Sequence, residues 1–534
     1  MNWKLNACAA FSAGLLSLGA SHSALAQDGF TFDVDEVETI DELPHLIELI
    51  DEGKRLYEDR KYAEASLRFY DVLADTTAGA ENYHPEAEYE LAKTLFRLEL
   101  YQGSLAYFSR IVEAGEFHPF YEASLRGLLL LSEVIPGDAM LVELLAGYAP
   151  LFPEVVPDEY RDRYAYLVGR HFYETLNIEE SLRMLNNVST RSDVYARARY
   201  IAGITHVANY DARAAVDAFR DVLRYLTRNA TPEELTGEER RLLDLTHLGM
   251  ARVYYSTGDY DTSLSYYERI KRDSPRWPDA LFESSWGFFQ VDKFNQALGN
   301  LHTINSPFFR NEYFPEGPIL AAVIYFYNCN YARVRDVLDD FDYVYEGVKG
   351  ELESIISANN DPALMYEWSE KWRSGEVEVD AEVRSALRAA LNDRQVEQRF
   401  NLVKAIEAEA EKMERLPASW KTSALGDSLL QESAIAHSFA VSDAGQLSQQ
   451  RLERVIGELE GLVSQQKRIL FEVARSERGE IEAELRAGMQ IDGGAGDGPS
   501  LDISDEHLYW EFDGEYWKDE LGFYFFNVKS ECRR

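Results

Sequence analysis

Histidines and carboxylates are the residues of this chain that could do acid–base or metal chemistry. The histidines between His84 and His302 stand singly and show no metal-ligand spacing. Carboxylates alternate at Glu407, Glu409 and Glu411, which is typical of a solvated helix face in so acidic a chain. The sequence contains no zinc signature, phosphate loop or nucleophile elbow. It therefore predicts a protein without catalytic residues, cofactor or bound metal.

Residues 489–507 are rich in glycine and aspartate, so two further functions have to be considered, nucleotide binding and calcium binding. Their glycines neither follow a strand nor open a helix, which argues against a nucleotide-binding loop. Asp492, Asp497, Asp502 and Asp505 could gather Ca²⁺, but they lack the regular ligand spacing of a calcium loop. We interpret the segment as a solvated linker.

The first residues of the chain indicate its compartment. A run of small and apolar residues ends in Ala-Leu-Ala, the small-x-small pattern of a signal peptidase site. This predicts a signal peptide over residues 1–26, cleavage between Ala26 and Gln27, and a periplasmic protein that opens with an N-terminal segment, 27–45. In an alternative interpretation Cys8 is a lipoprotein cysteine, although the apolar run lies after it. No later stretch is apolar for long enough to form a membrane helix.

Two cysteines, Cys329 and Cys532, would be left after removal of the leader, in an oxidising compartment where disulfides persist. Cys329 occupies a predicted hairpin turn, and Cys532 stands almost at the end of the chain. A bridge between them would restrict the unfolded chain by roughly 5 kcal/mol in the chain-entropy model. We expect one intramolecular disulfide; the alternatives are two free thiols or a mixed disulfide with a partner.

The formal net charge of −39 limits the classes of partner. Duplex nucleic acid and anionic lipid both require a basic face, so neither is an expected partner. Basic proteins, cations and proteins with apolar grooves are more compatible partners for a chain of this charge.

The elements that hold these residues form an internal repeat. In LGMARVYYSTGDYDTSLSYYERIKRDSP, residues 248–275, small Ala251 and Ser263 let two helices approach, the turn at Gly258 joins them, and Pro275 ends the second. The position of Ala251 recurs at intervals of 34 to 39 residues, apart from a double interval of 77 and one of 48 that fits an inserted loop. A large residue or His follows each of these positions three residues later. These repeat-frame positions are Gly53, Ala92, Gly169, Gly203, Ala251, Ser285 and Ala322.

These spacings resemble the tetratricopeptide repeat (TPR), a helical hairpin that stacks into a superhelical solenoid. The double interval between Ala92 and Gly169 leaves room for a degenerate unit within residues 121–148. The prediction is an all-α fold with a solenoid of seven to eight repeats over residues 46–345. The resemblance implies a concave groove for peptides or helices, lined by the first helix of each hairpin.

Long helices are predicted in residues 346–488. Apolar residues recur at steps of three and four from Val396 to Met413 and again from Leu452 to Val473. We expect these two helices to pair as an antiparallel coiled-coil hairpin, with room for a third helix around 424–442. Such a hairpin could project as an arm for homo-oligomerisation or partner binding; the alternative is that it caps the solenoid.

The aromatic tail, residues 508–534, is unusual in so acidic a chain. Strand-like composition at 508–512 and 523–528, with a turn signal between them, predicts a partly β structure. A pair of strands alone is marginal in water, so the rings need cover. A Cys329–Cys532 bridge would fold the tail onto the end of the solenoid as a lid.

The order of signal peptide, repeats, long helices and a tail with Tyr-Trp-x-Phe-x-Gly-Glu-Tyr-Trp at 509–517 resembles periplasmic TPR proteins of myxobacteria and relatives. These include proteins of the adventurous gliding motility machinery. The resemblance implies a non-catalytic scaffold or adaptor that binds other proteins of a cell-envelope complex, with no catalytic residue to carry over. The alternative function is a carrier or assembly factor for extended segments of outer-membrane or secreted proteins.

Overall fold

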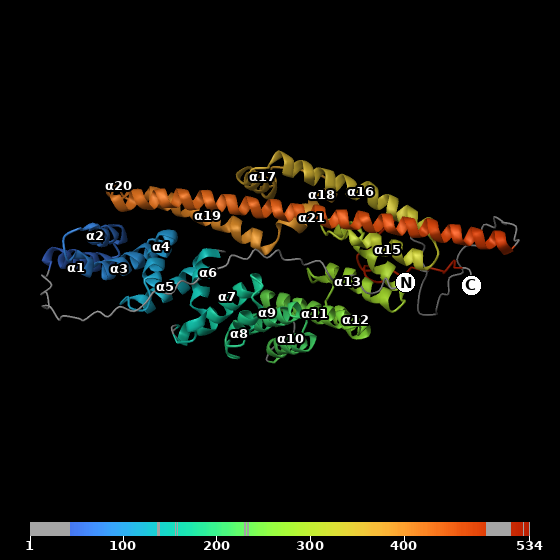
Figure 1. The fold of residues 1–534 in the computed structure, drawn as a ribbon, viewed down its shortest axis with the longest axis horizontal. Coiled ribbons are helices and arrows are strands. Elements are labelled where there is room, and N and C mark those ends of the chain that lie inside the picture. The colour runs from blue at the N-terminus through green and yellow to red at the C-terminus, as the bar shows by residue number, and fades with distance from the viewer. Residues whose placement is uncertain are drawn as a thin grey trace, which may run out of the picture. The chain divides into compact units, whose positions relative to one another are not determined.

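The structure is a computed structural model that describes residues 43–135, 139–154, 156, 158–228, 231, 234–487, 514–526 and 528–532. Its first sixteen helices pair in chain order into eight hairpins (Figure 1). The pairs are α1 (Pro44–Glu58) and α2 (Tyr62–Ala74), α3 (His84–Arg97) and α4 (Tyr101–Glu113), α5 (Tyr121–Val134) and α6 (Ala139–Gly147), α7 (Arg161–Glu174) and α8 (Ile178–Leu185), α9 (Tyr195–Ala208) and α10 (Ala212–Thr227), α11 (Gly237–Ser256) and α12 (Tyr260–Tyr267), α13 (Trp277–Gln290) and α14 (Phe294–Ile304), and α15 (Glu316–Tyr327) and α16 (Tyr331–Ala358).

Short 3-10 helices lie in several connections of the solenoid. They are η1 (Ala80–Asn82), η2 (Ala149–Leu151), η3 (Asp158–Tyr160) and η4 (Pro307–Phe309). The part of the chain that the structure describes contains no strand, which confirms the all-α prediction. The partly β tail is wrong over 523–526, where the chain is extended without strand pairing, while residues 508–512 lie outside the described residues.

Seven of the hairpins turn through one residue with a left-handed backbone, placed seven positions after the repeat-frame residue. After Ala251 this residue is Gly258, with φ 82°. The following N–H, of Asp259, donates to the carbonyl of Tyr254 at 3.0 Å. This is a Schellman cap, in which a left-handed residue ends the helix and satisfies its orphan carbonyls. The other six turn residues are not glycine: Arg60, Glu99, Leu176, Tyr210, Asp292 and Cys329.

Small residues at the repeat frame allow the two helices of a hairpin to approach. A Cβ atom at Gly53 would lie 2.6 Å from a ring carbon of Phe69, so no larger residue fits there without a shift. The hydroxyl of Ser263 donates to the carbonyl of Ala251 at 2.8 Å. The same bond recurs from Ser104 to Ala92 and from Ser181 to Gly169.

The degenerate unit expected at 121–148 is the hairpin α5–α6. Leu125 and Leu128 of α5 and Leu145 of α6 are fully buried. The hydroxyl of Tyr148 donates to the Val112 carbonyl of the preceding hairpin at 3.0 Å. This unit therefore packs in line with its neighbours, although its sequence lost the repeat signature.

The last hairpin of the solenoid extends beyond residue 345, because α16 continues to Ala358, and the C-terminal helices begin after it. They are α17 (Pro362–Ser374), α18 (Ala381–Leu391), α19 (Arg394–Arg415), α20 (Ala418–Lys421) and α21 (Ala424–Ala487). Helix α21 has 64 residues and is the orange-to-red helix of Figure 1. The third helix expected at 424–442 is its first part.

Helix α19 pairs with α21, as predicted, but it contacts the first part of α21 and not the predicted seam from Leu452 to Val473. Val396, Phe400 and Val403 of α19 pack against Ala440 and Ala444 of α21. The later seam of α21 packs on the last hairpin of the solenoid and on α17 and α18. Its apolar residues Leu452, Val455 and Leu459 contact α16, α17 and α18, and Leu462, Ile469 and Val473 contact α15 and α16.

Packing of the solenoid explains this arrangement. The last hairpin has no following repeat, so Val334, Leu338 and Phe341 of α16 would otherwise face water. The seam of α21 buries them, and its one polar position, Gln466, donates to the carbonyl of Leu338 at 3.0 Å. The seam is thus buried within the chain, against α15–α18.

Candidate interaction surfaces

The histidines, cysteines and carboxylates of the described residues form no metal-binding cluster. No group of three or more His, Cys, Asp or Glu side chains among them could hold a metal ion. His247 is packed beside Tyr266, and burial lowers the pKa of its imidazole to about 4. Within the same residues, no helix combines the length and apolar character needed to cross a membrane. The predicted cleavage residues Ala26 and Gln27 and the linker 489–507 lie outside the described residues.

The C-terminal helices also contact the first hairpins of the solenoid. Trp420 of α20 is 1% exposed, and its indole N–H donates to the hydroxyl of Ser66 at 3.0 Å. Leu429 of α21 packs so closely on Gly103 that a Cβ atom there would lie 2.9 Å from it. Helix α21 therefore contacts the solenoid near both ends, and we call α19–α21 the brace.

A buried carboxylate secures the brace to α4. Glu409 of α19 is 6% exposed and accepts a hydrogen bond from the backbone N–H of Gln102 at 3.1 Å, in the first turn of α4. Burial raises the pKa of this carboxyl to about 7, although the N–H groups and the ammonium of Lys412 act in the opposite direction. The ammonium of Lys412 itself pairs with Glu99.

A cleft lies between the brace and the solenoid, which we call the acidic cleft. It has a volume of about 330 Å³ and is bounded by α4, α6, α19 and α21. Its walls are mainly apolar, with Glu409 on the inside and Glu113 and Glu432 exposed at the rim. The lining residues are Gln102, Gly103, Leu105, Ala106, Ser109, Glu113, Leu141, Leu144, Glu409, Met413, Leu429, Glu432, Ser433 and Ala436.

A second pocket, of about 240 Å³, is lined by α6, α7, α19 and α21 and is polar. Its lining holds four charged residues, Arg170, Glu174, Arg399 and Asp443, and four glutamines, Gln395, Gln398, Gln446 and Gln450, so amide groups from both brace helices are available to a bound chain. Amides both donate and accept hydrogen bonds, which suits a peptide backbone.

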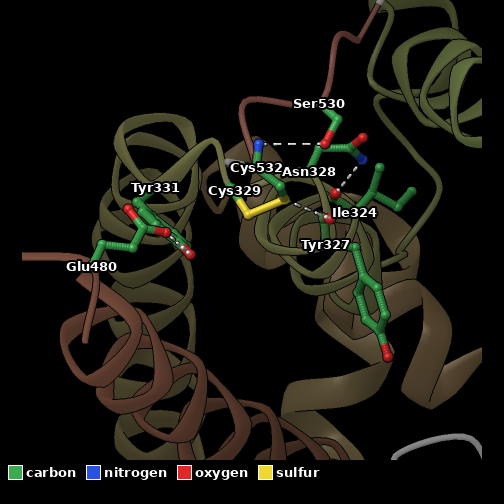
Figure 2. Close-up of a disulfide and its surroundings, with 8 residues drawn as sticks. All are labelled: Ile324, Tyr327, Asn328, Cys329, Tyr331, Glu480, Ser530 and Cys532. Carbon is green, nitrogen blue, oxygen red and sulfur yellow. Dashed lines mark hydrogen bonds between the residues drawn. A yellow bond between two sulfur atoms is a disulfide. The ribbon is translucent and has the colours of Figure 1, made fainter. Parts of the chain in front are cut away.

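The second candidate surface is built on the disulfide between Cys329 and Cys532 (Figure 2). The structure brings these two predicted residues together, with their sulfur atoms 2.01 Å apart. Cys329 is the left-handed residue of the α15–α16 turn, with φ 56°. Beside it, the N–H of Glu531 donates to the carbonyl of Asn328 at 2.8 Å. The end of the chain is thus fixed to the last turn of the solenoid.

From this anchor the tail runs along α14 in the opposite direction. The N–H of Phe526 donates to the Asn295 carbonyl at 3.3 Å, and the N–H of Gly522 donates to the Thr303 hydroxyl at 3.1 Å. Midway, the Gly299 position admits no side chain, because it would collide with the carbonyl of Tyr524. Two extended residues span about 6.6 Å and four helical residues about 6 Å, so alternate tail residues meet successive turns of α14.

This register divides the tail side chains into two sets. Tyr524 and Phe526 face α14 and surround His302, with ring centroids 4.9 and 5.3 Å from its imidazole. Phe523 and Phe525 point outward and are 75% and 62% exposed. The tail therefore binds as an extended peptide on helices α13–α15, whereas the brace covers the last hairpin. The predicted lid over the end of the solenoid is wrong in position.

Sequence reasoning missed Glu409, which it placed on a solvated face, and did not single out Trp420 or His302. A signal for Glu409 was present: it lies three residues after Ile406 and four before Met413, on the apolar stripe of α19. A carboxylate in phase with apolar positions indicates burial.

Comparison with known proteins gives only structural likeness. No family model and no curated protein matches the chain. It is similar to the C-terminal part of a TPR repeat-containing protein from Cytophaga hutchinsonii (14% identity, 54% of this chain and 95% of that chain, TM-score 0.29). It is also similar to the apo form of RapI (13%, 67% and 99%, TM-score 0.34) and to the TPR domain of P58(IPK) (10%, 74% and 99%, TM-score 0.17). Because these scores are low, the TPR architecture rests on the hairpins, turns and spacing of the chain itself.

Proposed function

We propose that this protein is a non-catalytic scaffold or adaptor of the periplasm that holds proteins of a cell-envelope complex. TPR-like folds generally mediate protein–protein interactions. The observation that carries the proposal is the acidic cleft between the brace and the first hairpins, where side chains from α4, α6, α19 and α21 meet. A role in gliding motility is part of the proposal and is supported by the sequence resemblance alone.

Crosslinking in intact cells followed by mass spectrometry tests this function. We expect a small set of envelope proteins in constant ratio to the bait, with crosslinks to peptides from α4, α6, α19 and α21. A matched bait carrying Ala436→Trp, which fills the cleft, should lose those partners while keeping its thermal stability. Recovery of the same partners with both baits would contradict a scaffold that works through this cleft.

A carrier for extended segments is the second candidate, and the tail favours it. Residues 522–526 show that an extended chain with alternate aromatic side chains can bind along α14. A carrier should crosslink to many unrelated outer-membrane or secreted proteins, in no fixed ratio. A constant small set of partners would exclude the carrier.

A further inference from the structure

The walls of the acidic cleft define the apolar part of a ligand. Leu141 and Leu144 of α6, Met413 of α19 and Leu429 of α21 line one continuous space with Ala436. A cavity of about 330 Å³ has the volume of roughly ten water molecules, more than one side chain fills. An occupant therefore brings at least two groups, one of them apolar.

The charges of the cleft define the other part. Glu113, Glu409 and Glu432 line it, and no Lys or Arg stands among the described residues of its lining. The ammonium of Lys412, which acts on Glu409, is paired with Glu99. The two exposed carboxylates, of Glu113 and Glu432, have no cation beside them in this lining, so they favour a cationic group and would repel an anionic ligand.

Helix α21 extends the same face beyond the cleft. Phe439 lies three residues after Ala436 and seven after Glu432, so the three share one side of the helix. Its ring is 72% exposed. About two and three turns farther, Gln446 and Gln450 line the second, polar pocket. An extended chain that follows α21 from Glu432 would thus meet the acidic and apolar cleft first and this polar pocket later.

We propose that the acidic cleft binds a lysine side chain of an extended partner segment, together with an apolar side chain two residues away in that segment. The lysine stem would lie against the leucine walls, and its ammonium would reach the carboxylates. Residues two apart in an extended chain point to the same side, so both side chains can enter together. This inference rests on the proposed function and names the chemistry of the partner.

Fluorescence anisotropy with the full chain tests the proposal. The probe is a fluorescein-labelled heptapeptide, Gly-Ser-Lys-Ser-Leu-Ser-Gly, and its matched control carries norleucine in place of lysine. Norleucine keeps the stem and removes the ammonium. We expect the lysine peptide to bind at least about tenfold more tightly, the effect of one charge-assisted hydrogen bond. The difference should shrink as salt is raised, because Glu113 and Glu432 are exposed at the rim.

Charge variants locate the site. Glu113→Gln with Glu432→Gln should weaken the lysine peptide several-fold and leave the norleucine peptide unchanged. The matched control is Glu346→Gln, which removes an exposed charge from α16, outside the cleft. Both variants should unfold at the same temperature as the wild type, because all three carboxylates are exposed.

Three outcomes overturn the inference: equal affinity for the two peptides, a loss of affinity in Glu346→Gln equal to that in the rim variant, or a dissociation constant above about 1 mM for the lysine peptide. None of these changes the crosslinking result, so failure of the lysine inference and failure of the scaffold function are distinguishable. If the wild type binds both peptides and Ala436→Trp abolishes both interactions equally, the cleft is a binding site but has no preference for a cation.

Discussion

The solenoid and the C-terminal part of this chain are held by two different kinds of contact. In the solenoid the same contacts recur: the left-handed turn residue and the small frame residue appear in hairpin after hairpin. In the C-terminal part each contact occurs once, as in the bond of Glu409 to Gln102 and the disulfide of Cys329 and Cys532. The repeated contacts are local, while the single contacts join distant segments. A substitution in the C-terminal part should therefore act on the whole molecule, and one in a hairpin should act locally.

The largest effect is expected where the brace covers the last hairpin. Leu459→Asp with Leu462→Asp places two charges at positions 0% and 5% exposed, and should lower the free energy of unfolding by at least about 5 kcal/mol. Urea unfolding measures the loss, and hydrogen exchange should show α15 and α16 losing protection together with α21.

The matched control for this pair is Phe471→Asp. Phe471 lies on the same helix but is 67% exposed, so its replacement should change stability by no more than about 0.5 kcal/mol. If α21 loses helicity while α15 and α16 keep full protection, the brace does not stabilise the solenoid and the contrast between the two regions fails.

Loss of the disulfide should have the next largest effect. Cys532→Ser should lower the free energy of unfolding by about 2–4 kcal/mol and expose residues 522–526 to hydrogen exchange. Binding of a hydrophobic dye should rise, because Tyr524 and Phe526 would leave His302. Reduction of the wild-type protein should reproduce the change, and Cys532→Ser should then be insensitive to reductant. Equal stability of wild type and variant under oxidising conditions would show that the tail is held by its side chains alone.

A smaller, pH-dependent effect is expected at Glu409. Its pKa is raised from 4.5 to about 7 in the folded state, so the protonated carboxyl is the form that the fold favours. This contribution is complete below about pH 4.5 and is lost as the pH rises through about 7. Between pH 5 and 8 it should change stability by about 1–3 kcal/mol, because a tenfold change in proton affinity corresponds to about 1.4 kcal/mol.

Glu409→Gln isolates this effect, because its neutral amide cannot titrate. The stability difference between wild type and Glu409→Gln should change with pH over this range, as measured by urea unfolding. Glu411→Gln, on the exposed face of the same helix, should follow the wild type. If the free energies of unfolding of wild type and Glu409→Gln change in parallel with pH, Glu409 does not titrate in this pH range.

The smallest effects are expected at the hairpin turns. Gly258→Ala should cost about 1 kcal/mol, because alanine is disfavoured at φ 82°. Leu176 holds the equivalent position at φ 60° with an exposed side chain, so Leu176→Gly should be neutral or stabilise by up to about 1 kcal/mol. Urea unfolding followed by hydrogen exchange should confine both changes to the affected hairpin. If hydrogen exchange in the brace changes as well, the expectation that a turn substitution acts only on its own hairpin is wrong.

The recurring part of the fold could be predicted from the sequence. Spacing located Gly53, Ala251 and the other frame positions, and counting cysteines pointed to Cys329 and Cys532, because these signals depend on residue type and interval alone. The partner of the α21 seam could not be predicted in the same way. Leu452 and Leu462 require an apolar surface, but α19 and the last hairpin both offer one, and their periodicities are alike. The choice depends on which surface would otherwise face water, and only the assembled solenoid shows that.

The brace also affects the order in which the chain can fold. Glu409 meets Gln102 across 307 residues, and Trp420 meets Ser66 across 354. Hairpins can form one by one while the chain is synthesised from its N-terminus, but these contacts can form only when most of the sequence has been synthesised. Until then the face of α2 and α4 that receives Trp420 and Glu409 is uncovered. The early hairpins therefore pass through a period in which they are folded but incomplete, and a nascent chain stopped before residue 409 would present that face to whatever is nearby.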